Sequence, residues 1–170
     1  MKRKGLIIAA FAGTGKTYLA KKYKNVIDLE SSKYKYDYSM CSSVDYEKLK
    51  GDKNRVPNNE WPQNYVKAIK NAQTKYDIVF VFICEEALEI YKKYNIDFIV
   101  CYPSELAFKK YYKSRYEGRG NSELWIKNVL SYYDKFVTNY LQKCEYEKII
   151  LNNDETLEDA LKKSGYIFIS

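Results

Sequence analysis

Short apolar runs alternate with polar stretches along most of the chain. Five of these runs are strand-sized, and they span residues 6–12, 26–29, 78–84, 98–102 and 148–151. The run at 78–84 reads IVFVFIC, and an unbroken apolar run rich in β-branched and aromatic residues is typical of a strand buried on both faces. The pattern therefore predicts five strands in one covered sheet.

The stretches between these runs carry apolar residues at helical spacing. They predict helices over residues 17–24, 85–93, 104–116, 122–143 and 156–163, and a further helix that opens at Trp61 and Pro62. Buried strands that alternate with helices form a parallel sheet with right-handed crossovers, and such sheets bind ligands at the carboxyl ends of their strands. We therefore expect an α/β fold with helices on both faces of the sheet.

A length of 170 residues suits a single domain with its own core. No apolar run reaches the roughly 18 residues of a membrane-spanning helix, and the run behind the basic start of the chain is too short for a signal peptide. The four cysteines lie far apart and form no C-x-x-C pair. We expect a cytoplasmic protein with reduced thiols and no membrane partner.

The content of histidine, lysine and arginine limits which catalytic and binding sites the chain can form. The chain has no histidine, which excludes histidine-based triads and metal sites that need imidazole. Its net charge of +7 favours polyanionic partners, nucleotides or nucleic acid, without choosing between them. Only four of the 29 basic residues are arginines, so a group of arginines is more informative here than a group of lysines.

The most specific motif directly follows the first apolar run. Residues 10–17, which we call the glycine loop, read AFAGTGKT and match the phosphate-binding pattern G-x-x-x-x-G-K-[ST] with Ala10 in place of the first glycine. In this context Lys16 supplies charge for the β- and γ-phosphates, and the Thr17 hydroxyl binds Mg²⁺. The residues expected to hold a triphosphate are Ala12, Gly13, Thr14, Gly15, Lys16, Thr17 and Tyr18. The alternative, an ordinary turn before a lysine-rich helix, is weaker because a buried strand precedes the motif and a helix follows it.

Two other classes of nucleotide-binding protein fit less well. Residues 74–77 read TKYD, which matches the guanine-specific N/T-K-x-D, but they precede a predicted strand and do not follow one. No D-x-x-G switch motif occurs, and a motor ATPase usually needs a longer chain. We therefore interpret the chain as a small kinase.

With its N-terminal glycine loop, its polar insert after the second strand and its Gly/Arg break before a long helix, the chain resembles nucleoside monophosphate kinases and their shikimate-kinase-like relatives. It is also similar to small P-loop nucleotide kinase-like proteins of bacteriophages. The resemblance implies a three-layer P-loop NTPase fold with a five-stranded parallel sheet in the order 2-3-1-4-5. It further implies a substrate-binding insert within residues 33–70, a lid near residues 115–121, and a loop after the last strand that passes the adenine of ATP, where Asn152 lies.

The lid is also predicted from the residues themselves. Arg115 and Arg119 are four apart, so they share a face if the helix continues, and Gly118 and Gly120 give the backbone around them freedom to move. Arginines of this kind stabilise the charge of a phosphoryl transition state, and a closing segment excludes water. We favour this interpretation over the alternative, a solvated basic helix end capped by Gly118.

Acidic residues follow two of the predicted strands. Asp28 and Glu30 could hold Mg²⁺ through water or bind an acceptor, and Asp28 could instead be the base for a hydroxyl acceptor. The alternative is that Asp28 and Glu30 are ordinary turn residues. Glu85, after the third predicted strand, is another candidate to lie near the metal and its bound water. We assign Thr17 and Asp28 to the metal, and Asp28 and Glu30 to substrate binding.

Two further residues are candidates for acceptor binding. Arg55 is the only arginine of the insert, and we expect it to bind the acceptor's phosphate. Tyr65 is a candidate for stacking on a base, although with 19 tyrosines in the chain core packing is a strong alternative.

We therefore expect ATP- and Mg²⁺-dependent phosphoryl transfer to a nucleoside or deoxynucleoside monophosphate, with Lys16, Arg115 and Arg119 as the catalytic residues. An anionic acceptor needs no general base, which agrees with the absence of histidine. One rival is a kinase for a hydroxyl acceptor, such as a small metabolite or a polynucleotide 5′ end. The other is a non-enzymatic module that binds nucleotide or nucleic acid; we do not favour nucleic acid as the partner, and we leave open whether the protein is a monomer or a homodimer.

Overall fold

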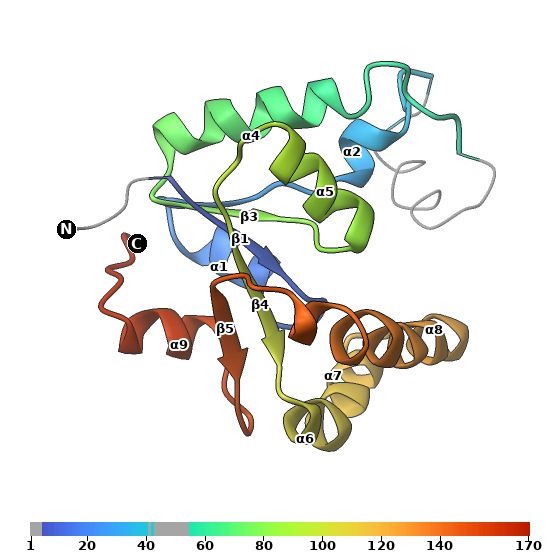
Figure 1. The fold of residues 1–170 in the computed structure, drawn as a ribbon, viewed down its shortest axis with the longest axis vertical. Helices are drawn as coiled ribbons and strands as arrows, with labels where there is room; N and C mark the ends of the chain where they lie inside the picture. Colours follow the sequence, from blue (N-terminus) through green and yellow to red (C-terminus); the bar gives the residue numbers. More distant parts are fainter. Residues whose placement is uncertain (1–4, 41, 43–54) are drawn as a thin grey trace.

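The computed structural model describes residues 5–40, 42 and 55–170. Its strands form one five-stranded parallel sheet in the order β2-β3-β1-β4-β5, which Figure 1 shows running through the middle of the molecule. The strand bounds are β1 (Leu6–Ala10), β2 (Val26–Asp28), β3 (Ile78–Val81), β4 (Ile99–Pro103) and β5 (Lys148–Leu151). The five predicted strands, the α/β class and the strand order are confirmed.

Helices connect consecutive strands, as the pattern predicted. The α-helices are α1 (Lys16–Lys22), α2 (Ser32–Lys35), α4 (Gln63–Lys75), α5 (Glu85–Lys93), α6 (Glu105–Ala107), α7 (Lys113–Gly118), α8 (Glu123–Tyr133) and α9 (Leu157–Lys163). Two π-helical segments, η1 (Phe108–Tyr112) and η2 (Asp134–Thr138), and one 3₁₀ segment, η3 (Leu141–Lys143), complete the description.

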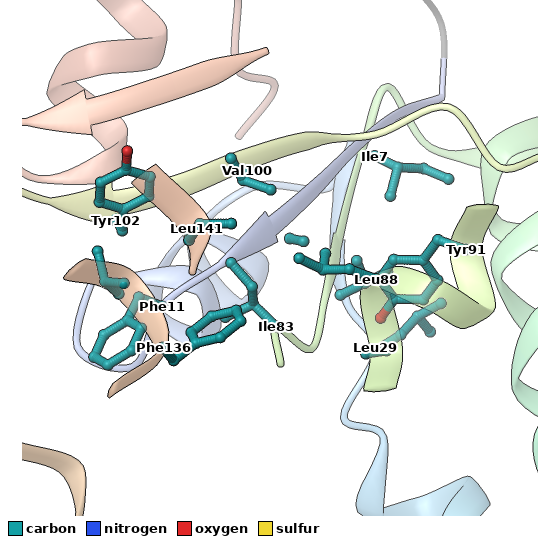
Figure 2. Packing of buried hydrophobic residues seen from close by; sticks show 14 of the residues in the cluster. Ile7, Phe11, Leu29, Ile83, Leu88, Tyr91, Val100, Tyr102, Phe136 and Leu141 are labelled. Atoms are coloured by element: carbon teal, nitrogen blue, oxygen red, sulfur yellow. The ribbon is translucent and has the colours of Figure 1, made fainter. Parts of the chain in front are cut away.

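Alternating side chains of β1 contribute to two separate cores. Ile7 and Ala9 belong to a core with α4, α5, α7 and α8, whereas Leu6, Ile8 and Ala10 belong to a core with α1 and α9. Figure 2 shows the first core, to which Ile7 of β1, Val100 of β4, Leu88 of α5 and Leu141 of η3 all contribute. Because helices cover both faces, the sheet can be apolar throughout, and its carboxyl edge is left for polar residues.

The single long helix predicted over residues 122–143 is wrong. The α-helix ends at Tyr133, and a wider π turn and a 3₁₀ turn follow it. The backbone N–H and the side-chain amide of Asn139 both donate to the carbonyl of Asp134, at 3.2 and 3.0 Å. An asparagine that bonds the backbone in this way competes with the regular helical ladder, and the apolar spacing does not reveal it.

The described part of the insert forms a short antiparallel contact, and the C-terminal segment packs against the end of α1. In the insert, Cys41 and residues 43–54 lie outside the described part. Tyr36 forms an antiparallel bridge with Pro57. Cys84, Cys101 and Cys144 are free thiols, as predicted. Among the described helices, none has the length and apolar character needed to cross a bilayer. The C-terminal residues pack on the α1–β2 turn, where Phe168 stacks on Tyr23 at 4.4 Å.

Candidate functional site

The glycine loop and Asp28 meet where β1 and β2 end. The glycine loop leaves β1 and leads into α1, and the last residue of β2 is Asp28. The Thr17 hydroxyl, on the first turn of α1, donates a hydrogen bond of 2.8 Å to the Asp28 carboxylate. Parallel strands place these ends at one edge of the sheet, so the two proposed metal-binding oxygens lie together.

Two glycines give the loop its shape. Gly13 and Gly15 have φ of 84° and 107°, a region that other residues rarely adopt. At Gly13 a side chain is excluded for a second reason, because a Cβ atom would lie 2.8 Å from the ring of Tyr116. The backbone conformation therefore favours glycine at both positions, and at Gly13 the packing of α7 excludes a side chain as well.

The carbonyl groups of the loop all accept hydrogen bonds. Lys16 donates to the carbonyls of Ala10 and Phe11 at 2.6 and 3.3 Å, and the Thr14 hydroxyl also donates to Phe11 at 2.8 Å. The next carbonyls are bound by other parts of the chain: Ala12 by the Tyr116 hydroxyl at 2.9 Å, Gly13 by Arg115 at 3.4 Å, and Thr14 by the Leu157 amide at 3.1 Å.

The backbone amide groups from Gly13 to Thr17, in contrast, have no protein hydrogen-bond partner among the described residues. Backbone donors of folded proteins are nearly always paired with protein, water or ligand, and consecutive free amides in a glycine-rich turn form a concave anion site. The chemistry of the loop thus fits the phosphate groups of a nucleotide.

Lys16 carries the charge of this site. The side chain is half-buried, and burial lowers the pKa of its ammonium group below the ordinary lysine value, an effect that the negative charge of Asp28 opposes. The positive charge of Arg119 adds to the lowering, and Glu30 opposes it.

The two lid arginines have different surroundings. Arg115 is bound on three sides: its guanidinium contacts the Gly13 carbonyl at 3.4 Å, lies 4.7 Å from the ring centre of Tyr112, and pairs with both the carbonyl and the carboxylate of Asp154. Arg119 caps the C-terminus of α7 with an exposed side chain, which makes no hydrogen bond or ion pair with the described residues. Among the described residues, the Arg119 side chain has no hydrogen-bond or ion-pair partner, whereas Arg115 is already engaged with the loop.

The predicted acceptor residues are more scattered. The hydroxyl of Tyr65 donates to the Leu29 carbonyl at 2.9 Å, and its ring is fully buried and stacked on Trp61, so the structure supports core packing for Tyr65 and leaves no open face for a base. Arg55 lies 3.8 Å above the ring of Tyr36, in the insert.

The remaining candidates lie at the edges of the site. Glu30 lines an open groove that also includes Thr17 and Asp28. Glu85 is exposed in the first turn of α5. Tyr18 is 60% exposed on α1, and the amide of Asn152, in the loop after β5, donates to Glu155 at 3.3 Å.

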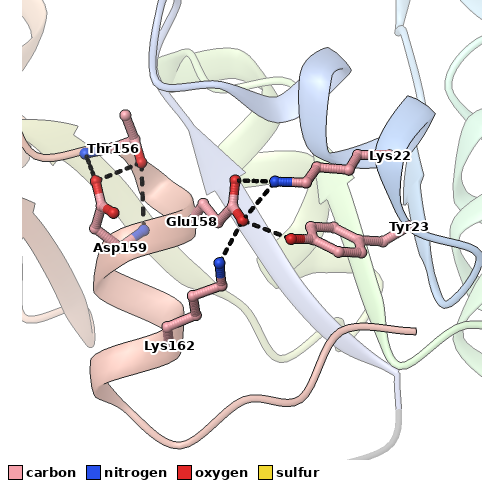
Figure 3. A network of polar contacts seen from close by, with 6 residues as sticks. All are labelled: Lys22, Tyr23, Thr156, Glu158, Asp159 and Lys162. Carbon is pink, nitrogen blue, oxygen red and sulfur yellow. Dashed lines mark hydrogen bonds and ion pairs between the residues drawn. The ribbon is translucent and has the colours of Figure 1, made fainter. Parts of the chain in front are cut away.

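Helix α9 is bonded to the C-terminal end of α1, the end away from the loop. Glu158 accepts hydrogen bonds from Lys22 at 2.9 Å, from the Tyr23 hydroxyl at 2.5 Å and from Lys162 at 2.6 Å, as Figure 3 shows. Donors of this kind lower the pKa of Glu158 to about 2, so it is a carboxylate at any ordinary pH. These bonds, which we call the brace, tie α1 to α9, the helix whose first amide holds Thr14.

Sequence reasoning missed Tyr116, Asp154 and Leu157, the groups that hold the loop or its arginine from outside. The sequence carries no signal for them, since a tyrosine among 19, a loop aspartate and a helical leucine are each ordinary. Comparison with known proteins adds nothing to the geometry: neither a scan against protein-family models nor a search of curated proteins found a match for this chain.

Proposed function

We propose that the protein is an ATP- and Mg²⁺-dependent kinase that transfers a phosphoryl group to a nucleoside or deoxynucleoside monophosphate. The observation that carries this proposal is the hydrogen bonding of the glycine loop, whose carbonyls are bonded by protein groups while its amides from Gly13 onward are not. Its carbonyls accept hydrogen bonds, those of Ala12, Gly13 and Thr14 from other parts of the chain. Its amides from Gly13 to Thr17, at the start of α1, are unpaired within the described chain. Such an array of N–H groups donates hydrogen bonds to the oxygens of a polyphosphate.

The side chains around the loop suit the same ligand. The Thr17 hydroxyl and the Asp28 carboxylate, 2.8 Å apart, supply oxygen ligands for Mg²⁺, which takes its remaining ligands from phosphate oxygens and water. In this proposal Lys16 neutralises the β- and γ-phosphates, and Arg119 stabilises the charge that develops on the transferred group.

The two kinase hypotheses differ in whether the acceptor group must lose a proton. A monophosphate acceptor is already anionic and requires no proton to be removed. A hydroxyl acceptor requires a base, and Asp28, half-buried and at the end of β2, is the carboxylate placed for that role. The sheet geometry supports both, and the resemblance to monophosphate kinases favours the first.

A substrate panel tests the proposal. The common ribo- and deoxynucleoside monophosphates and a 5′-hydroxyl oligonucleotide are each incubated with ATP and Mg²⁺, and ADP release is measured for the wild type and for Lys16→Ala. We expect release with one or more monophosphates and none from the variant. Release with the oligonucleotide alone would assign the rival kinase activity, and no release with any acceptor would contradict the proposed enzyme.

A further inference from the structure

Three consecutive carbonyls of the glycine loop are held from outside by two helices. The Tyr116 hydroxyl and the Arg115 guanidinium of α7 donate to Ala12 and Gly13, at 2.9 and 3.4 Å. The first amide of α9, that of Leu157, donates to Thr14 at 3.1 Å. Both helices are far from the loop in the sequence, so these contacts come from the fold and not from the motif.

The planarity of the peptide bond gives these contacts a consequence for binding. In a trans peptide the C=O group and the following N–H group point in opposite directions. A carbonyl that is fixed outward therefore fixes the next amide inward. The bonds to Ala12, Gly13 and Thr14 in this way orient the N–H groups of Gly13, Thr14 and Gly15, which are free of protein acceptors among the described residues.

We propose that Tyr116 is a positioning residue for phosphate binding, and that Arg115 and the Leu157 amide share this role. The proposal rests on the proposed function and deepens it, because it says what holds the anion site in its binding shape. Tyr116 is suited to this role because its ring is fully buried, fits against the space left by Gly13, and meets the ring of Trp125 edge-on at 5.1 Å. An exposed or mobile side chain would orient a peptide group poorly.

The variant Tyr116→Phe removes the hydroxyl and keeps the ring. Its matched control is Tyr133→Phe, since Tyr133 is equally buried and its hydroxyl also donates to a backbone carbonyl, that of Pro103 at 2.7 Å, which is not part of the loop. The Tyr133 ring meets Phe11 of the loop edge-on at 5.6 Å, and a phenylalanine keeps this contact. Both variants lose one buried hydrogen bond, so both should lower the melting temperature by a similar, modest amount. Only Tyr116→Phe should alter the anion site.

The readout is the affinity for inorganic tripolyphosphate and for ATP with Mg²⁺, measured by calorimetry. We expect Tyr116→Phe to weaken both by roughly five- to tenfold, the effect of about one hydrogen bond, and Tyr133→Phe to leave both unchanged. In turnover the loss should appear in KM and not in kcat, because the loop holds the phosphates in the ground state and the transition state alike. Equal affinities for the two variants would overturn this inference while leaving the kinase proposal standing; a wild type that binds neither ligand would overturn both.

Discussion

At Lys16 partial burial opposes the positive charge that we propose for phosphate binding. Burial lowers the pKa of the ammonium group, so the group loses its proton at a lower pH than an exposed lysine does. A bound phosphate favours the charged form and raises that pKa again. Affinity for ATP should therefore be complete below the pKa of the free protein and fall as the pH rises through it.

This pH dependence is measured by calorimetry with ATP and Mg²⁺ between about pH 7 and about pH 10, the range below the ordinary lysine pKa. Lys16→Arg is the control, because a guanidinium stays charged throughout and its weaker binding should not vary with pH. An affinity of the wild type that is as flat as that of Lys16→Arg would show that Lys16 does not carry the binding charge.

Asp28 separates the two kinase hypotheses at the level of one side chain. Asp28→Asn keeps a partner for the Thr17 hydroxyl but removes the charge and the basic oxygen. A hydroxyl kinase should then lose several orders of magnitude in kcat, since a general base contributes about 10²- to 10⁴-fold and the metal site is also weakened. A monophosphate kinase should lose less, roughly tenfold, through the metal alone. Steady-state kinetics with the preferred acceptor gives the answer.

The residues of the site were predictable only where a motif marks them. The glycine loop and Asp28 were found because their types are unusual at those positions in the pattern. Tyr116 and Tyr65 look alike in the sequence, and both are buried with the hydroxyl bonded to a backbone carbonyl, yet only Tyr116 bonds the glycine loop. That difference depends on which element faces which, and one sequence does not contain it.

Among the elements, the end of α7 is the part proposed to act on the transferred phosphate. Arg119→Ala should lower kcat much more than it weakens ATP binding, by roughly 10²-fold or more, because the charge acts on the transition state. Lys113→Ala, which removes another exposed cation of the same helix, is the control and should leave kcat unchanged. A loss confined to ATP affinity would contradict the catalytic role of Arg119.

The brace between α9 and α1 predicts a stability effect with a defined pH dependence. Glu158→Gln should lower the free energy of unfolding by about 1–3 kcal/mol near neutral pH, the range for hydrogen bonds to a charged group. The pKa of Glu158 falls from 4.5 to about 2 on folding, so this stabilisation is complete above about pH 4.5 and is lost as the pH falls toward about 2.

Urea unfolding of both proteins at several pH values measures this difference, and Glu89→Gln provides the comparison. Glu89 pairs with Lys92 on the surface, where water screens the two charges, so its loss should lower the free energy of unfolding much less. If Glu158→Gln were as mild as Glu89→Gln at neutral pH, α9 would not brace α1 through this carboxylate.

The elements themselves were largely readable from the sequence. The buried strands were predicted because a continuous apolar run of this length seldom forms anything but a covered strand in an α/β pattern. The cap of α6 was predicted at Ser104, whose hydroxyl accepts from the Ala107 amide at 3.3 Å. The break after α8 was not predicted, because Tyr132, Phe136 and Tyr140 keep helical spacing and stack on one another while the backbone changes to a π turn.

At the scale of the whole molecule, the parallel sheet brings distant segments to one edge. The loop after β1, the end of β2, helix α7 and the start of α9 meet there, although they are spread over about 140 residues of sequence. The net charge of +7 accompanies this arrangement and is compatible with nucleic acid as well. A purely nucleic-acid-binding module would show steep salt dependence and no phosphoryl transfer, which separates it from the kinase.

The central claim is that residues 10–17 bind the phosphates of a nucleotide, and calorimetric titration of ATP with Mg²⁺ into the wild type and Lys16→Ala tests it most directly. We expect the wild type to bind ATP at one site per chain. We expect Lys16→Ala to bind it roughly a hundredfold or more weakly, with an unchanged melting temperature. No binding of any purine triphosphate by the wild type, or equal binding by the two proteins, would contradict this claim.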